Sequence, residues 1–339
     1  MTIEIQEADD STLERWNNLV ERSDGATPFH RREALTHLAE TSNTEVRFLV
    51  GYKGQEPVGL FPIFVTTKGP FRMVYSPPPH LEVYYLGPTL LNFAKLKQRK
   101  AERRHREFID GAIEWIEAEI DPAYVDVRTV DEYTDLRPFS WNGFDVSPSY
   151  TYILDLTGED LLMQFSRDAR SNVRNRDDGC TIREAGVAGI EAVISQIQDR
   201  HAAQGKEYRI DPEFVTELYE RLPDGCVRPY VCERDGEILG GMVTLETDDT
   251  IYRWQGGAKS DVEFPINDLL DWHIIQEAQE RGLTRYDLVG ANLPRLCRYK
   301  SKFGPEPVAY HTVQRKSTRM QAVTGVYRRL PSALKVVSE

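Results

Sequence analysis

Two stretches of this 339-residue chain, VRFLVGYKGQEPVG at residues 46–59 and VRPYVCERDGEILG at residues 227–240, align without a gap, so that Val46 corresponds to Val227 and Gly59 to Gly240. In each stretch, residues typical of strands flank a polar turn that contains glycine, which is the pattern of a β-hairpin. Self-similarity of this kind indicates an internal duplication. The sequence therefore predicts two halves that contain the same hairpin.

A second match follows each hairpin. A helical pattern leads into a short strand that carries one aspartate, Asp126 in the first half and Asp287 in the second. These aspartates are closer in the sequence than the two hairpins are, so the first half holds about 20 more residues between hairpin and helix. This extra length coincides with Pro77-Pro78-Pro79 and a basic run at 95–106. Insertions are typical of surface loops, so we expect a flexible, solvated loop at 95–106, with contact to an RNA backbone as the alternative.

The remaining periodicity completes each half. Apolar residues at helical spacing predict early helices at 13–20 and 190–197, and later helices at about 106–119 and 267–281. Each half then reads as helix, antiparallel strands, helix and strand, an α+β arrangement. We place the domain boundary at Ser147-Pro148-Ser149. This gives domains at 1–149 and 150–316 and a basic C-terminal tail or helix at 317–339.

Composition limits the classes of function. Lys plus Arg is 42 and Asp plus Glu is 54, so the net charge is −12, which excludes a protein that coats DNA or an anionic membrane with its whole surface. No stretch approaches the ~18 apolar residues of a membrane span, and the acidic N-terminus lacks the features of a targeting signal. The four cysteines form no C-x-x-C pair, which favours reduced thiols and no structural metal. We expect a cytoplasmic protein.

Three stretches of the second half resemble Fem-type aminoacyl transferases. They are TYILDLTGEDLLMQFSRDARSNVRNRDDGCTIREA from residue 151, IYRWQGGAKSDVEFPINDLLDWHIIQEAQERGLTRYDLVG from residue 251, and RYKSKFGPEPV from residue 298. The third resembles the family's motif of an aromatic residue, Lys, two residues, Phe and Gly, with Tyr299 in place of the more usual Phe. The resemblance is fainter in the first half.

The resemblance implies two tandem GNAT-like domains, each a mixed, mainly antiparallel sheet flanked by helices. It implies an N-acyltransferase that moves an aminoacyl group from aminoacyl-tRNA to an amine on a phosphate-bearing small-molecule or peptide acceptor. No cofactor is expected. Two alternatives stay open: a GNAT N-acetyltransferase that uses acyl-CoA as donor substrate, and a non-catalytic module that binds RNA or a nucleotide-sugar.

The segment at 264–268 bears on the donor. An ordinary GNAT enzyme holds the pyrophosphate of acyl-CoA on backbone N–H groups of a glycine-rich turn at a helix N-terminus. Here the sequence is FPIND, without glycine. The sequence therefore favours a donor that is held in another way.

The motif segment supplies the main catalytic candidate. If 295–302 is extended, Arg298, Lys300 and Lys302 share one face, and Tyr299 points away to stack on a base or pack. An ammonium group stabilises the negative charge that develops in acyl transfer, so Lys300 is the candidate catalytic residue. The alternative is a solvated cationic strand. Because no nucleophile signature occurs, we expect direct attack by the acceptor amine.

Further candidates lie upstream. Thr157-Gly158-Glu159-Asp160 has the form of a capping box, so a helix is expected to begin there, with Arg167, Arg170 and Arg174 on one face. These arginines would bind substrate phosphates or form a solvated basic face. Tyr252 and Trp254 alternate in a strand and serve as a substrate platform or as core. Asp287 is a candidate base or a structural cap.

Overall fold

The structure is a computed structural model that describes residues 2–175, 179–259, 265–318 and 320–321. The basic tail predicted for 317–339 thus falls largely outside the described residues, and so does Phe264 of the FPIND segment.

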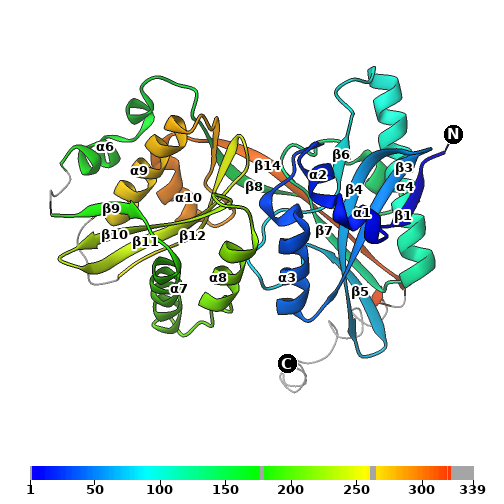
Figure 1. Cartoon of the computed structure of the whole chain (residues 1–339), viewed down its shortest axis with the longest axis horizontal. Helices are drawn as coiled ribbons and strands as arrows, with labels where there is room; N and C mark the ends of the chain where they lie inside the picture. Colours follow the sequence, from blue (N-terminus) through cyan, green and yellow to red (C-terminus); the bar gives the residue numbers. More distant parts are fainter. Residues whose placement is uncertain (1, 176–178, 260–264, 319, 322–339) are drawn as a thin grey trace.

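The two halves repeat one sheet topology (Figure 1). In the first half, antiparallel strands end in β5, which pairs in parallel with β7; in the second, antiparallel strands end in β12, which pairs in parallel with β13. The strands of the first half are β1 (Glu4–Glu7), β2 (Ser23–Asp24), β3 (Glu45–Lys53), β4 (Glu56–Lys68), β5 (Phe71–Ser76), β6 (Thr89–Leu91) and β7 (Tyr124–Arg128). Those of the second half are β9 (Thr181–Glu184), β10 (Val227–Arg234), β11 (Glu237–Glu246), β12 (Thr250–Ala258) and β13 (Arg285–Asp287).

The predicted duplication is confirmed in detail. In β3–β4, Gly51 pairs with Gly59 and a register shift follows; in β10–β11, Cys232 pairs with Gly240 and the same shift follows. Both pairs and both bulges stand at positions that the gap-free alignment of the two hairpins makes equivalent. The α+β fold class and the division into two similar halves are therefore correct.

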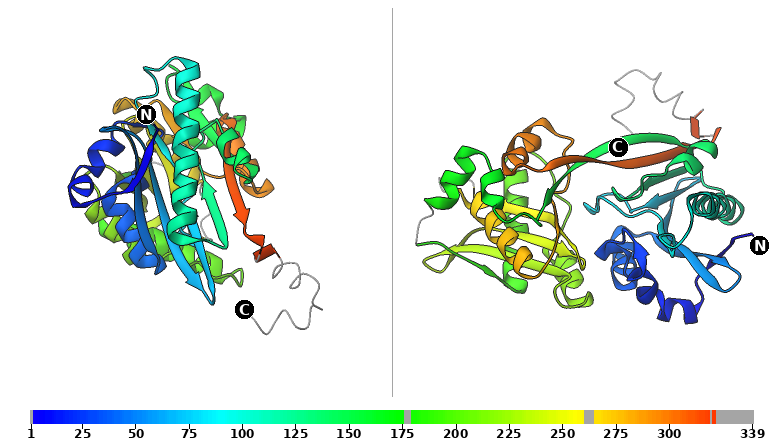
Figure 2. Two further views of the ribbon diagram at one scale, coloured as in Figure 1. Left: turned by 90° about the vertical axis from the view of Figure 1, so that its right-hand side faces the viewer. Right: turned by 90° about the horizontal axis from the view of Figure 1, so that it is seen from above.

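Two long strands join the halves into one sheet. β8 (Asp145–Asp155) leads from the first half to the second, and β14 (Glu306–Lys316) returns, lying antiparallel between β7 and β8 (Figure 2, right). Gln314 of β14 pairs with Asp126, and Ile153 of β8 pairs with Asp287. The boundary placed between 149 and 150 lies inside β8, and the domain limits stay a prediction.

Helices cover both faces of the sheet (Figure 1). Their bounds are α1 (Asp10–Glu14), α2 (Trp16–Val20), α3 (Arg32–Ser42), α4 (Gln98–Ile120), α5 (Arg137–Trp141), α6 (Arg167–Arg174), α7 (Val187–Ala202), α8 (Pro212–Arg221), α9 (Ile266–Glu280) and α10 (Pro294–Lys300), with short 3-10 turns η1 (Pro28–His30), η2 (Leu161–Gln164) and η3 (Ser301–Phe303). The early and late helices expected from periodicity are present in both halves.

Two local expectations were wrong. The basic run at 95–106 is mostly the first turns of α4, because Phe108, Ile109 and the apolar residues after them anchor a helix long enough to extend back to Gln98. The segment Thr157–Asp160 begins no α-helix, since η2 intervenes and Ser166 caps α6 instead.

One apolar cluster crosses between the halves. Leu35 and Leu38 of α3 belong to the same buried cluster as Val215 and Leu218 of α8 and Trp254 of β12. The halves therefore share part of their apolar core.

Candidate functional site

A cavity of about 490 Å³ lies between the halves. The first half contributes His80, Glu82 and Tyr84 to its wall, and the second half contributes a set that is rich in cations. The basic residues that line it are Arg200, Lys206, Arg209, Arg253, Arg295 and Lys300. In a chain of net charge −12, six cations against two acids, Glu82 and Glu207, form a local basic site.

Lys300 lies in this wall, but on a helix. The expectation of an extended motif segment was wrong: Pro294 occupies the first turn of α10, where its missing N–H is no loss, and Lys300 is the last helical residue. Lys300 is only 5% exposed. Because this segment is helical, Arg298, Lys300 and Lys302 do not lie on one face of a strand.

Two backbone carbonyls hold the Lys300 ammonium group. Nζ donates to Val289 O and, at 2.9 Å, to Gly290 O. Burial, together with the nearby charge of Arg253, lowers the pKa of Lys300 to about 8. An ammonium has three N–H donors, so one is left beyond these two bonds for a group in the cavity.

The turn that presents these carbonyls is strained. Val289 has a φ of 51°, in the left-handed region that β-branched residues rarely adopt, and Gly290 follows with a φ of 76°. Asp287 fixes the turn, because its carboxyl accepts from Val289 N at 2.7 Å and from Thr151 Oγ1. Strain of this kind persists only where the surroundings impose it, and it is concentrated at functional sites.

Asp287 itself is fully buried and does not line the cavity. Burial raises its pKa to about 6, although the hydrogen bonds from Thr151 and Val289 oppose this. Asp287 thus lies behind the turn, which agrees with the structural role that the sequence offered as an alternative. Its role as a base stays a prediction, because Asp287 does not contact the cavity.

Arg253 is held by a buried carboxylate. Asp271 of α9 accepts from Arg253 Nε at 2.9 Å, from Tyr286 Oη at 2.7 Å and from Tyr299 Oη at 2.8 Å. Tyr299 therefore ties α10 to α9, and the Arg253 guanidinium lies 5.6 Å from its ring centroid. Sequence reasoning named Tyr252 and Trp254 but missed Arg253 between them.

Trp254 and Gln255 complete the wall on β12. Trp254 Nε1 donates to Glu82 O at 2.9 Å, and its ring contacts Phe29 and Phe214, so this residue is both core and cavity wall. Gln255 Oε1 accepts from Tyr208 Oη, and Gln255 Nε2 is buried without a protein partner among the described residues. A buried, unpaired donor in a cavity wall is available to a ligand oxygen.

The other predicted residues lie elsewhere. Arg298 is exposed, and Lys302 pairs with Asp268. Arg170 Nη1 donates to Met163 O and Phe165 O, which ties η2 to α6. Arg167 and Arg174 are exposed on α6, and none of these five residues lines the cavity. Arg200 and Arg295, which the sequence did not single out, line the cavity instead. Neither has a carboxylate partner among the described residues.

The start of α9 carries its own anion. Asp268, in the first turn, is 3% exposed and is bound by Lys302 and by Asn172 Nδ2 at 2.8 Å. This carboxylate lies in the first turn, where the helix dipole favours negative charge, and Lys302 balances it.

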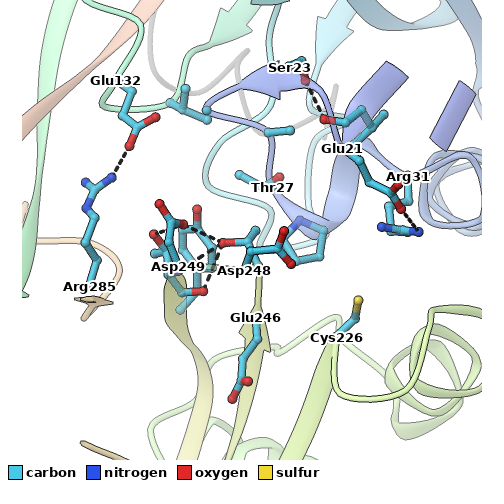
Figure 3. A pocket seen from close by; sticks show the side chains of 18 of the residues that line it. Glu21, Ser23, Thr27, Arg31, Glu132, Cys226, Glu246, Asp248, Asp249 and Arg285 are labelled. Carbon is cyan, nitrogen blue, oxygen red and sulfur yellow. Dashed lines mark hydrogen bonds and ion pairs between the residues drawn. The ribbon is translucent and has the colours of Figure 1, made fainter. Parts of the chain in front are cut away.

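Residues of both halves also line a second, acidic cleft of about 520 Å³ (Figure 3). Glu132, Glu246, Asp248 and Asp249 lie in it, partly paired with arginines such as Arg285. A narrow apolar neck separates it from the basic cavity: Tyr252 lines the neck and the cleft, whereas Tyr84, Trp254 and Val289 line the neck and the basic cavity.

No described helix is both long and apolar enough to cross a bilayer.

Comparison with known proteins agrees with this architecture. The family model of an acetyltransferase (GNAT) domain matches residues 164–301, and no curated protein matches the chain. FemX has a similar structure, with a TM-score of 0.71 and 15% identity over 91% of this chain and 96% of FemX.

Two further solved structures are similar. The C-terminal domain of a putative lysylphosphatidylglycerol synthetase from Agrobacterium fabrum gives a TM-score of 0.57 and 14% identity over 94% of this chain and 96% of that one. A tandem GNAT protein from the clavulanic acid biosynthesis pathway gives a TM-score of 0.50 and 13% identity over 93% of this chain and 98% of that one. The family model thus identifies residues 164–301 as an acetyltransferase (GNAT) domain, and the solved structures show that the whole chain has the fold of FemX and of tandem GNAT proteins.

Proposed function

We propose that this acyltransferase moves an aminoacyl group from aminoacyl-tRNA to an acceptor amine. The basic cavity with its buried Lys300 carries the proposal. The acceptor that we infer from the Fem-type resemblance is an amine on a phosphate-bearing small molecule or peptide, and the cytoplasm remains the predicted compartment.

Charge supports a polyanionic donor. Arg200 and Arg295 line the cavity without a carboxylate partner in the described part of the chain, and burial together with the charges of Arg253 and Arg295 lowers the pKa of Arg200. An incoming phosphate would relieve this repulsion. Elsewhere the negative net charge opposes a polyanion, so binding is expected to concentrate at this cavity.

The α9 terminus disfavours coenzyme A. The segment FPIND lacks the glycines that let a pyrophosphate approach backbone N–H groups, and Asp268 already supplies a negative charge to the helix dipole in the first turn. An aminoacyl-tRNA needs no such subsite, because its phosphates can be bound at the cavity mouth.

The reaction follows from the chemistry of an ester. The neutral acceptor amine attacks the ester carbonyl carbon, a C–N bond forms, and the bond from the carbonyl carbon to the ribose oxygen breaks. The nitrogen gives up one proton to water, and the ribose oxygen gains one. The remaining Lys300 N–H would stabilise the oxyanion or give its proton to the leaving oxygen, and a pKa of about 8 keeps it mainly protonated at neutral pH.

Binding and transfer assays test the proposal. Titration with aminoacyl-tRNA at increasing salt is expected to give affinity that falls steeply, and Arg200→Ala with Arg295→Ala is expected to flatten the logarithmic slope by about 1.4–1.8 for two phosphates. The matched control is Arg167→Ala with Arg174→Ala on α6, which is expected to leave the slope unchanged. A slope lowered by the control alone would assign RNA binding to α6.

The second candidate is an acyl-CoA-dependent N-acetyltransferase, which the description of the matched domain favours. It predicts saturable binding of acetyl-CoA and none of tRNA. That result, or a lack of transfer from labelled aminoacyl-tRNA to any amine tested alongside acetyl transfer from acetyl-CoA, would overturn the proposed donor.

A further inference from the structure

A buried histidine and two carboxylates meet where the two halves touch, away from the basic cavity. His37 and Glu40 are three residues apart on α3 of the first half, so they share a helix face, and Glu217 comes from α8 of the second. One ligand atom from each lies within 4.8 Å of the other two. We propose that these residues bind one divalent transition-metal ion of the Zn²⁺ type, which ties the halves together.

The histidine is arranged as metal-ligating histidines are. His37 is 4% exposed, and its Nε2 donates to Phe214 O at 2.9 Å. With the proton on Nε2, Nδ1 carries a lone pair, and this atom is buried without a hydrogen-bond partner among the described residues. Metal-bound histidines use their second ring N–H in this way, to fix the tautomer on a backbone carbonyl or carboxylate.

The lone pair needs a positive charge opposite it. Nδ1 faces Glu217 Oε2 at 3.3 Å and Glu40 Oε2 at 3.8 Å, both acceptors. These separations are long for a charge-assisted hydrogen bond, which is typically about 2.7–2.9 Å. The separation from Glu217 matches the distance of about 3.3 Å between neighbouring ligands of a tetrahedral ion with bonds of ~2.0–2.1 Å, and the exposed Glu40 side chain would have to move about 0.5 Å closer to bind the same ion. The spacing therefore fits a metal ion better than a bridging proton.

Arg221 sets the charge balance at this site. Its guanidinium contacts Glu217 and, at 2.8 Å, Glu40, so it holds the two carboxylates together in the metal-free state. One arginine leaves the pair with a net charge of −1, and a divalent ion would be attracted to it. Arg221 also competes with that ion, because it uses the same Oε2 atoms.

The ion would act as a structural clamp rather than in the reaction. It would join α3 to α8 next to Phe214, whose ring stacks on His37 at 5.1 Å and contacts Trp254 at 6.1 Å. Trp254 lines the basic cavity, so the clamp would hold one of its walls. This inference stands apart from the proposed function, since it names no donor or acceptor.

Calorimetric titration of the chelator-treated full chain with Zn²⁺ tests the site, with Mg²⁺ as the comparison ion. We expect one Zn²⁺ per chain, no Mg²⁺ binding, and a Tm rise of about 3–6 °C at a hundredfold excess over Kd. His37→Gln is expected to abolish this binding, and the half-exposed Glu40→Gln to weaken it at least about tenfold. Arg221→Ala is expected to strengthen it, and His311→Gln, outside the cluster, to leave it unchanged.

Substitution with Co²⁺ distinguishes this site from the thiols. A visible d–d band without a thiolate charge-transfer band is expected, and Glu40→Gln, which leaves the core intact, is expected to change it. Absence of saturable Zn²⁺ binding by the wild type overturns the proposal, and so does binding that is unaffected in both His37→Gln and Glu40→Gln. Detection of an Nδ1 proton on His37 by NMR in the presence of excess Zn²⁺ also overturns it.

Discussion

Lys300 combines burial, a lowered pKa and a strained partner turn, and each comes from identifiable neighbours. The carbonyls of Val289 and Gly290 fix its ammonium group, and Asp287 fixes those carbonyls from behind. Asp287 is thus a positioning residue for a lysine that it does not touch.

Replacing Lys300 tests its role directly. Lys300→Met is expected to lower kcat about 10²–10³-fold, the usual cost of losing one donor to a developing oxyanion. In the wild type, kcat is expected to fall as pH rises through about 8, because Lys300 then loses its proton. Arg298→Met, exposed on the same helix, is the control for folding and activity. A variant with wild-type kcat and the same pH profile would remove Lys300 from the mechanism.

Asp287 is expected to make the free energy of unfolding depend on pH. Its folded pKa of about 6 lies above its ordinary 3.8, so the folded state holds this proton more tightly. The carboxyl therefore lowers stability as pH rises from about 4 to 6, by on the order of 2–3 kcal/mol. Asp287→Asn is expected to lack this decline. Urea unfolding of the wild type and of Asp287→Asn at pH 4, 5, 6 and 7 measures the free energy of unfolding. The same dependence on pH in both proteins would contradict the prediction.

At the scale of elements, the hairpins depend on glycines that face a helix. A Cβ atom on Gly59 would lie 2.6 Å from Cε1 of Phe108, which is fully buried on α4. Gly59→Ala is therefore expected to lower the free energy of unfolding by about 1–3 kcal/mol through overpacking. Gly186→Ala, where nothing lies within 4 Å, is the control and is expected to change it by under about 0.5 kcal/mol. Equal effects would contradict the packing argument.

The first turn of α4 is poorly matched to its dipole. Lys97 is the N-cap without a side-chain cap bond, and Arg99 and Lys100 follow it. Lys97→Asp supplies a capping acceptor and a favourable charge, so we expect it to raise the free energy of unfolding by about 0.5–1.5 kcal/mol. Denaturant unfolding checks the gain. The same variant would weaken tRNA binding if this turn, rather than the basic cavity, contacts RNA.

At the scale of the molecule, the exchange of strands makes the halves interdependent. β14 lies between β7 and β8, so a first half without it exposes the edge of β7. A fragment of residues 1–155 is expected to aggregate or stay unfolded, and a peptide of residues 304–318 to restore part of its structure. Circular dichroism measures the secondary structure of the fragment with and without the peptide, and gel filtration measures its aggregation. A monomeric, folded fragment without the peptide would contradict it.

Much of the fold was readable from the sequence because its signals are local. The hairpins at 46–59 and 227–240 carry their own turn chemistry, and the bulges after Gly51 and Cys232 stand at equivalent positions in the two. The capping box at Thr157–Asp160 misled because its Leu161–Gln164 continuation packs as a 3-10 turn. The prediction of an extended segment at 295–302 was wrong because, over so few residues, alternating cations are compatible with a strand and with a helix.

The cavity was decided by the tertiary structure alone. Lys300 was named from its motif, whereas Arg200, Arg253 and Arg295 come from three separate stretches that only the shared core brings together. His37 and Glu217 likewise belong to different halves of the chain and meet only because α3 packs on α8. The sequence by itself determined the duplication, its hairpins and the motif lysine, since these depend on neighbours along the chain. The cation set, the burial of Lys300 and the contact between the halves depend on long-range packing, which no local pattern records.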